Sequence, residues 1–254
     1  MFFKTTEDHE NLRMKIREFA ETEVKPIAFM LDKENEFPTE AVKKLGEMGI
    51  LGTPFPKEYG GAGLDMLSYA IAVEELSRVD GGTGVILSAH VSLGSYPIFA
   101  YGTEEQKQKY IPKLASGEWL GAFGLTEPNA GTDAAGQQTT AVLDEATNEW
   151  VINGSKIFIT NAGYADVYVI FGMTDRSKGL KGISAFILEA GTPGFSIGKK
   201  EKKLGIKGSS TCELIFENVR IPKSNLLGEV GKGFKIAMMT LDGGRIGIAS
   251  QALG

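Results

Sequence analysis

The feature that most constrains the fold is a change of pattern between Gly117 and Trp119. Before this point apolar residues recur at the spacing of amphipathic helices, and after it short alternating or apolar runs are typical of strands. A chain whose helices come first and whose strands follow is typical of the α+β class. We therefore predict an all-α helical domain over residues 1–118 and an antiparallel β-sheet or barrel domain over residues 119–232.

The helical part has recognisable helix starts and ends. Thr103-Glu-Glu-Gln106 has the form of a capping box, in which the threonine and glutamine side chains bond each other's backbone N–H groups, and Gly117 suits the end of that helix. Residues 85–99 are almost uncharged and predict a buried helix. Further helices are predicted over residues 6–31, 36–49 and 65–79.

The sharpest local prediction in the strand-rich part is a hairpin turn at Asn153-Gly154. Apolar residues at 150–152 and 157–159 lie on either side of this pair, and Asn-Gly is a favoured two-residue turn between antiparallel strands. Further strands are predicted over residues 167–173, 183–188, 195–198 and 212–216.

The last segment is helical again and is apolar almost all round, interrupted only by Gly243 and Gly244. Such a helix needs partners on several sides. We therefore expect residues 233–254 to be the first helix of a further, C-terminal helical domain, and the sequence to be a fragment of a longer protein.

The composition argues against some classes of function and indicates a cellular location. Of 254 residues 42% are hydrophobic, the net charge is −5, and charges of one sign form no long run, so we expect neither a nucleic-acid nor a membrane role. Cys212 is the only cysteine, and the residues from Met1 to Asp8 lack the apolar core of a signal peptide. We therefore expect a reducing, cytoplasmic location.

Several common sites are not supported by the sequence. The segment Gly228-Glu-Val-Gly-Lys-Gly233 has the glycine spacing of a phosphate loop, but Phe234 and Lys235 follow where Lys and Ser/Thr are required. No glycine motif of the Rossmann type follows a predicted strand. His9 and His90 are the only histidines, so we expect no metal site. His90 lies in the predicted apolar helix, and we expect it to be a core residue.

The stretch Phe123-Gly-Leu-Thr-Glu-Pro-Asn-Ala-Gly-Thr132, continued by Asp133-Ala-Ala-Gly136, begins as a strand and breaks into a loop at Pro128. Glycine allows close backbone approach, and the hydroxyls of Thr126 and Thr132 donate or accept hydrogen bonds. The loop therefore suits an anionic or carbonyl-rich cofactor, although a plain surface turn uses the same residue types.

Five motifs together resemble the acyl-CoA dehydrogenase family, most closely its short-chain, butyryl-CoA branch in anaerobic bacteria. They are Glu58-Tyr-Gly-Gly61, Tyr110-Ile-Pro-Lys-Leu-Ala-Ser-Gly-Glu118, the stretch from Phe123, Asn153-Gly-Ser-Lys-Ile-Phe-Ile-Thr160 and Asp242-Gly-Gly-Arg245. The resemblance implies an N-terminal helical domain, a middle β domain and a C-terminal four-helix domain, with FAD bound between the last two.

The resemblance also assigns cofactor-binding residues. They are Phe123, Gly124, Leu125, Thr126, Gly131, Thr132, Phe158, Ile159 and Thr160. Thr126 would bond the pyrimidine side of the flavin, Thr132 would lie near the pyrophosphate and the CoA thioester, and Thr160 would lie near the flavin N5. The alternative for Phe158 is a core position in the predicted hairpin.

The resemblance further implies that the CoA substrate would be bound by Thr132, Asp242, Gly243, Gly244 and Arg245. The alternative for Asp242 and Arg245 is an ordinary ion pair three residues apart on a helix. Because two glycines are poor helix formers, we expect another group to approach closely at Gly243 and Gly244.

No catalytic residue is assigned. The family uses a glutamate to remove the α-proton of the acyl-CoA, either in the C-terminal domain or just before the arginine of the substrate-binding helix, where this chain has Gly244. We therefore expect the base to lie beyond Gly254 and the 254-residue chain to be inactive by itself.

The function implied is that of an FAD-dependent short-chain acyl-CoA dehydrogenase, which passes hydride to flavin N5 and electrons to an electron-transferring flavoprotein, within a homodimer or homotetramer. Three alternatives stay open: an enoyl-CoA reductase in a bifurcating flavoprotein complex, acting also on aryl-acrylyl thioesters; an acyl-CoA oxidase; and a flavin- and CoA-binding module without chemistry.

Overall fold

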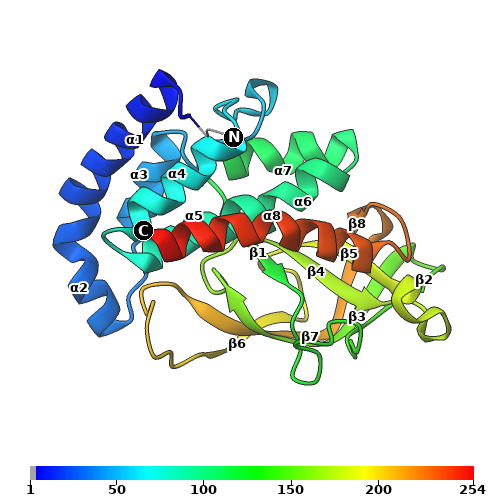
Figure 1. The fold of residues 1–254 in the computed structure, drawn as a ribbon. Coiled ribbons are helices and arrows are strands. Elements are labelled where there is room, and N and C mark those ends of the chain that lie inside the picture. Colours follow the sequence, from blue (N-terminus) through cyan, green and yellow to red (C-terminus); the bar gives the residue numbers. More distant parts are fainter. Residues whose placement is uncertain (1–3) are drawn as a thin grey trace.

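The computed structural model describes residues 4–254. Helices form one layer, an eight-stranded sheet forms the other, and the long helix α8 (Gly233–Leu253) runs between them (Figure 1). The predicted order, helices first, then a sheet and a closing helix, is confirmed.

Residues 1–3, on which part of the signal-peptide expectation depends, lie outside the described residues. The domain boundaries drawn above stay a prediction.

The predicted helices are all present. Before α8, the helices are α1 (Glu7–Phe19), α2 (Lys25–Glu34), α3 (Thr39–Glu47), α4 (Met66–Ser77), α5 (Gly81–Ala89), α6 (Tyr96–Tyr101) and α7 (Glu104–Ser116). The capping box predicted at Thr103 and Gln106 starts α7, and Gly117, with φ of 77°, ends it. A π-helical turn joins α5 to α6 at His90–Ser95, so residues 81–101 form one continuous helical rod. The predicted apolar helix lies within this rod.

The sheet is mixed. Its strands are β1 (Gly121–Gly124), β2 (Thr140–Asp144), β3 (Glu149–Thr160), β4 (Val167–Met173), β5 (Ile183–Glu189), β6 (Phe195–Lys200), β7 (Thr211–Pro222) and β8 (Leu226–Leu227). The order is β6-β7-β3-β2-β4-β5-β8, with β1 beside β4. Most pairs are antiparallel as predicted, but β1 pairs with β4 in parallel and β2 meets β4 through one parallel pair.

The hairpin predicted at Asn153-Gly154 is wrong. Strand β3 continues through this pair, and the turn from β2 to β3 lies between Asp144 and Glu149. The pairing of β3 with β7 shifts between Ile152 and Gly154, and Gly154 has φ of 141°. A Cβ on Gly154 would lie 2.7 Å from the Cα of Thr139. The glycine therefore allows the backbone of residue 139 to come close at this irregularity in the strand pairing.

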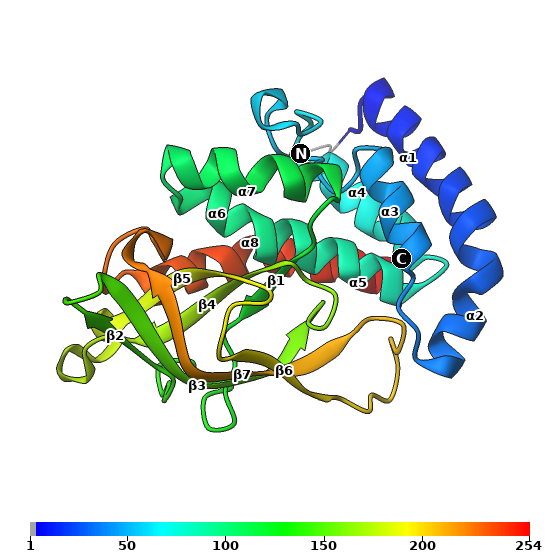
Figure 2. The same ribbon diagram turned by 180° about the vertical axis from the view of Figure 1, so that it is seen from behind.

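The middle of the sheet is buried on both faces. All residues of β4 are buried, which explains the continuous apolar run in the sequence. Val167, Val169 and Phe171 belong to the cluster shared with the helices, and Tyr168 and Ile170 belong to a second cluster on the opposite face. β1, β4 and β5 accordingly lie beside the helices, and β3, β6 and β7 farther away (Figure 1, Figure 2).

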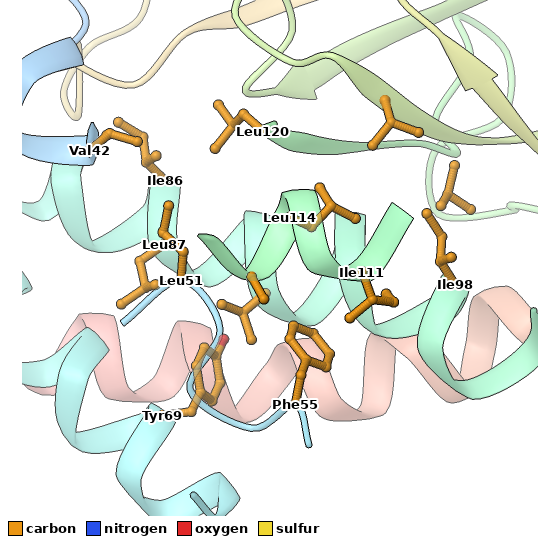
Figure 3. Close-up of a cluster of buried hydrophobic side chains, with 14 of the residues drawn as sticks. Val42, Leu51, Phe55, Tyr69, Ile86, Leu87, Ile98, Ile111, Leu114 and Leu120 are labelled. Carbon is orange, nitrogen blue, oxygen red and sulfur yellow. The ribbon is translucent and has the colours of Figure 1, made fainter. Parts of the chain in front are cut away.

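The main core joins the helices to one another and to the sheet. Figure 3 shows Phe55, Tyr69 and Leu114, from different elements, pointing into one cluster. Helix α8 packs against α4, α5 and β5, so its apolar sequence finds partners on two sides. Ile246, Ile248 and other large side chains of α8 are nevertheless half exposed. Within residues 4–254 no helix is long and apolar enough to cross a membrane.

Candidate functional site

A cavity of about 520 Å³ opens where the two layers meet α8. Its walls come from the rod around Leu93, from Phe123 on β1, from the loop that follows β1, from the end of β3 and from α8. Eight of the nine predicted cofactor residues line it: Phe123, Leu125, Thr126, Gly131, Thr132, Phe158, Ile159 and Thr160. Segments that are far apart in the sequence therefore meet at one cavity.

The ninth residue, Gly124, is buried behind the cavity wall. A Cβ on Gly124 would lie 3.2 Å from both Ile170 and Leu214, so this glycine is explained by packing within the sheet. The opposite holds for Gly131, where a Cβ would meet nothing within 4 Å and the space is open. The glycine of the loop thus leaves room on the cavity side.

A second cavity, of about 540 Å³, continues along α8. It shares Ala89, Leu93, Thr160, Leu241 and Arg245 with the first cavity, so the two form adjoining chambers. The second chamber is lined mostly by apolar side chains and by small residues of α5 and α8. A narrow apolar group bound there would lie beside the part of the first cavity that these shared residues line.

The predicted substrate residues are not all brought together. Thr132 and Arg245 line the first cavity, and Arg245 and Gly244 line the second. Gly243 faces a separate groove on another side of α8, and Asp242 is exposed and lines neither chamber. No ion pair joins Asp242 to Arg245 among the salt bridges of residues 4–254, so the helical ion-pair alternative is not supported.

Phe158 is held in an unusual conformation that presents its ring to the cavity. Its φ is 61°, in the left-handed region, and 58% of the residue is exposed. It lies in a second irregularity of the pairing between β3 and β7, between Lys156 and Ile159. The bulge turns Phe158 out of the sheet core, so its alternative as a core residue is wrong.

The cavity wall carries hydroxyl groups that are not used internally. Within the described chain, the side chains of Thr126, Thr132 and Thr160 make no hydrogen bond. The carbonyl of Thr126 accepts the N–H of Ile157 at 2.8 Å, which ties the loop to β3. Free hydroxyls and the aromatic ring of Phe158, which line the same cavity, fit a planar ring with polar edges, as a flavin has.

Sequence reasoning missed a buried ion pair behind this loop. Lys156 Nζ lies 2.7 Å from Glu127 Oε1, and the two side chains are 0% and 3% exposed. Burial lowers the pKa of Lys156 to about 8. Despite burial the pKa of Glu127 is lowered, because Lys156 and backbone N–H groups favour the carboxylate. The available signal was a lysine directly before the apolar run of residues 157–159 in β3.

His90 is a core residue, as predicted, and connects the two layers. Its Nδ1 accepts the N–H of Gly121 on β1 at 3.0 Å, and its Nε2 donates to the carbonyl of Leu114 on α7 at 3.0 Å. Burial lowers the pKa of His90 to about 4. In the part of the chain that the structure describes, no group of three His, Cys, Asp or Glu side chains could hold a metal ion.

Comparison with known protein families gives two adjacent matches. Residues 6–118 match the N-terminal domain of acyl-CoA dehydrogenases, and residues 122–219 match the middle domain. The chain belongs to the acyl-CoA dehydrogenase family. The family accounts for the fold order described above, and its short-chain members are among the most similar relatives.

Two relatives illustrate the similarity. Over its whole length, the chain is 65% identical to the short-chain specific acyl-CoA dehydrogenase of Clostridium acetobutylicum. It covers 66% of that relative's length. It is 53% identical to the acryloyl-CoA reductase (NADH) of Anaerotignum propionicum, of which it covers 64%. The chain thus spans slightly less than two thirds of the length of these relatives.

Solved structures agree with the family assignment. Butyryl-CoA dehydrogenase from Megasphaera elsdenii matches with a TM-score of 0.96 and 52% identity, covering 99% of this chain and 66% of that one. A chain in a structure of the electron transferring flavoprotein of Acidaminococcus fermentans matches with a TM-score of 0.97 and 58% identity, with 99% and 66% covered. An acyl-CoA dehydrogenase from Bacillus anthracis, solved with FAD, matches with a TM-score of 0.91 and 42% identity, with 98% and 42% covered.

Proposed function

We propose that this chain is part of an FAD-dependent acyl-CoA dehydrogenase that acts on short-chain acyl thioesters. The observation that carries the proposal is the first cavity, where unpaired threonine hydroxyls, the outward-turned ring of Phe158 and the cation of Arg245 converge. FAD, when bound, would accept hydride from the β-carbon of the thioester and pass electrons on. The site-residue roles given above belong to this proposal.

Each wall of the cavity suits a different part of the ligands. The hydroxyls of Thr126 and Thr160 would donate hydrogen bonds to polar edges of the flavin, where negative charge gathers on reduction. The ring of Phe158 would cover an apolar face. The second chamber, with its small and apolar lining, would admit a short acyl chain, and Arg245 would meet anionic or carbonyl oxygen atoms between the chambers.

The base that removes the α-proton is proposed to lie outside these residues. Asp133 is the only carboxylate lining the two chambers within residues 4–254. It is exposed, and its Oδ1 accepts the N–H of Ala135 at 3.2 Å, which stabilises the loop. This arrangement supports a chain that binds both ligands but needs a base from elsewhere in the full protein.

A reductase working in the opposite direction is the second candidate, favoured by the 53% identity to an acryloyl-CoA reductase. The same groups would then hold an enoyl thioester. An electron-transferring flavoprotein as redox partner, a homo-oligomeric state and a cytoplasmic location belong to the same proposal. The location is supported by the single, buried cysteine, Cys212, which a reducing compartment would keep as a thiol.

The test is an anaerobic visible spectrum recorded with FAD before and after addition of butyryl-CoA. We expect the 254-residue chain to bind FAD without bleaching, and the longest product that its gene encodes to bleach. Bleaching of the 254-residue chain would place a base within it and contradict the account of the missing base. Absence of FAD binding in both forms would contradict the proposed function.

A further inference from the structure

The buried pair of Lys156 and Glu127 has no role in the proposed function as described above. Its side chains have almost no contact with water and do not line either chamber. Lys156 Nζ also lies 3.1 Å from Gln137 Oε1 and 3.4 Å from the carbonyl of Leu125. One ammonium group therefore contacts the beginning and the end of the cavity loop.

The carboxylate of Glu127 closes the same loop from the other side. Its oxygens accept the N–H of Gln138 at 2.5 Å and the N–H of Thr139 at 3.1 Å, where the loop enters β2. Glu127 also exchanges two backbone hydrogen bonds with Ala130, both of 3.1 Å. The carboxylate of Glu127 therefore joins the beginning of the loop to residues 138 and 139, where the loop ends.

Lys156 connects this loop to the opposite wall. It lies directly before the bulge that turns Phe158 toward the cavity, and the next N–H, that of Ile157, donates to the carbonyl of Thr126. A shift of the Lys156 side chain would therefore change the distance between the loop that carries Thr126 and the strand that carries Phe158. The two walls of the first cavity meet at this pair.

Stability alone is a poor explanation for the pair. Removing two charges from water is costly, and well-packed apolar residues often stabilise a core as well as a buried ion pair does. What apolar residues cannot provide is a fixed direction, since they would leave the N–H groups of Gln138 and Thr139 and the carbonyl of Leu125 without these partners.

We propose that Lys156 and Glu127 are positioning residues that fix the spacing between the two walls of the flavin cavity. This inference rests on the proposed function, since it gives the walls a ligand to hold. Neither side chain would touch the flavin. Their effect would pass through the loop carrying Thr126 and Thr132 and through the bulge at Phe158.

The experiment compares Lys156→Met, Glu127→Gln and the double variant Lys156→Met/Glu127→Leu in the longest product of the gene. Lys109→Met is the matched control, because it removes the ammonium of the surface pair with Glu189, 2.6 Å apart. FAD dissociation constants and visible spectra are measured anaerobically. We expect about a 10-fold weaker affinity or more, and an altered flavin spectrum, in the three core variants, and wild-type values in the control.

The double variant keeps the test decisive if the single variants fold poorly, since it leaves no unpaired buried charge. A folded double variant with wild-type affinity and spectrum would overturn the inference. Hydrogen exchange without flavin is the second readout: we expect the N–H groups of Gln138, Thr139 and Ile157 to exchange about 10-fold faster or more in the double variant. Unchanged exchange would also overturn it, whereas failure of the wild type to bind FAD would count against the proposed function only.

Discussion

At the scale of one residue, Phe158 combines a predicted place in the site with an unpredicted conformation. The resemblance to the family indicated Phe158 as a cofactor-binding residue, yet nothing in its neighbours indicated a left-handed backbone. The conformation comes from the shifted pairing of β3 with β7, whose residues lie roughly 50 positions later. For a non-glycine residue this conformation costs roughly 1–2 kcal/mol. The strain is consistent with a ring that is positioned for a ligand.

Replacing Phe158 separates the strain from the ring. We expect Phe158→Gly to have a free energy of unfolding about 1 kcal/mol higher than that of Phe158→Ala, because glycine adopts positive φ without the Cβ clash. Both variants should bind FAD about 3- to 10-fold more weakly, since both lose the aromatic face. Urea unfolding and FAD titration measure the two effects. Equal stability of the two variants would show that the bulge relaxes when the ring is removed.

At the scale of one element, α8 shows how glycines on a single helix serve different purposes. We predicted close approach at Gly243 and Gly244, and this is right only for Gly244, where a Cβ would lie 2.9 Å from Leu93. A Cβ on Gly243 would meet nothing within 4 Å. The tightest glycine on α8 is Gly247, since a Cβ there would overlap the Tyr69 hydroxyl and crowd Ser88. The sequence pattern did not indicate this position.

Two alanine substitutions on α8 should therefore have opposite effects. Gly243→Ala should raise the free energy of unfolding by up to about 1 kcal/mol, because alanine favours the helix and the space is open. Gly247→Ala should lower it by roughly 1–3 kcal/mol, because Tyr69 and Ser88 must move away from the new methyl group. Thermal or urea unfolding of both variants checks the prediction, and a destabilised Gly243→Ala would contradict it.

At the scale of the whole molecule, the helical layer, the sheet and the closing helix followed from periodicity, caps and apolar runs, since these are local properties. The parallel pairing of β1 with β4, the bulges of β3 and the ion pair of Lys156 with Glu127 did not, because each depends on residues far apart in the sequence. The same holds for the site: the motifs indicated Arg245 and eight cofactor residues in the lining of the first cavity, and only the fold showed that Asp242 and Gly243 lie elsewhere.

The contact between the layers at His90 should make stability depend on pH. The pKa of the native His90 is about 4, against the ordinary value of 6.5, so between these values the unfolded chain binds a proton that the native protein does not. The contribution of His90 is thus fully present above pH 6.5 and is lost as the pH falls toward 4. The difference corresponds to about 3 kcal/mol.

Urea unfolding of the wild type and of His90→Gln between about pH 7 and pH 4.5 measures this loss. The variant should be less stable at neutral pH, since a glutamine replaces both hydrogen bonds poorly. Over this pH range, however, its free energy of unfolding should fall by about 2 kcal/mol less than that of the wild type. The difference between the two curves isolates His90 from carboxylates that titrate in both proteins. Parallel curves would contradict the assignment.

The packing of α8 also has a consequence for synthesis on the ribosome. The side chain of Gln251 donates to the carbonyl of Gly81 at 3.2 Å, a contact between residues 170 positions apart. At typical rates of translation, the ribosome needs roughly 10–30 s to add the residues between them. During that interval the surface of α4 and α5 around Tyr69, which α8 later covers, is exposed on the nascent chain and is open to a chaperone.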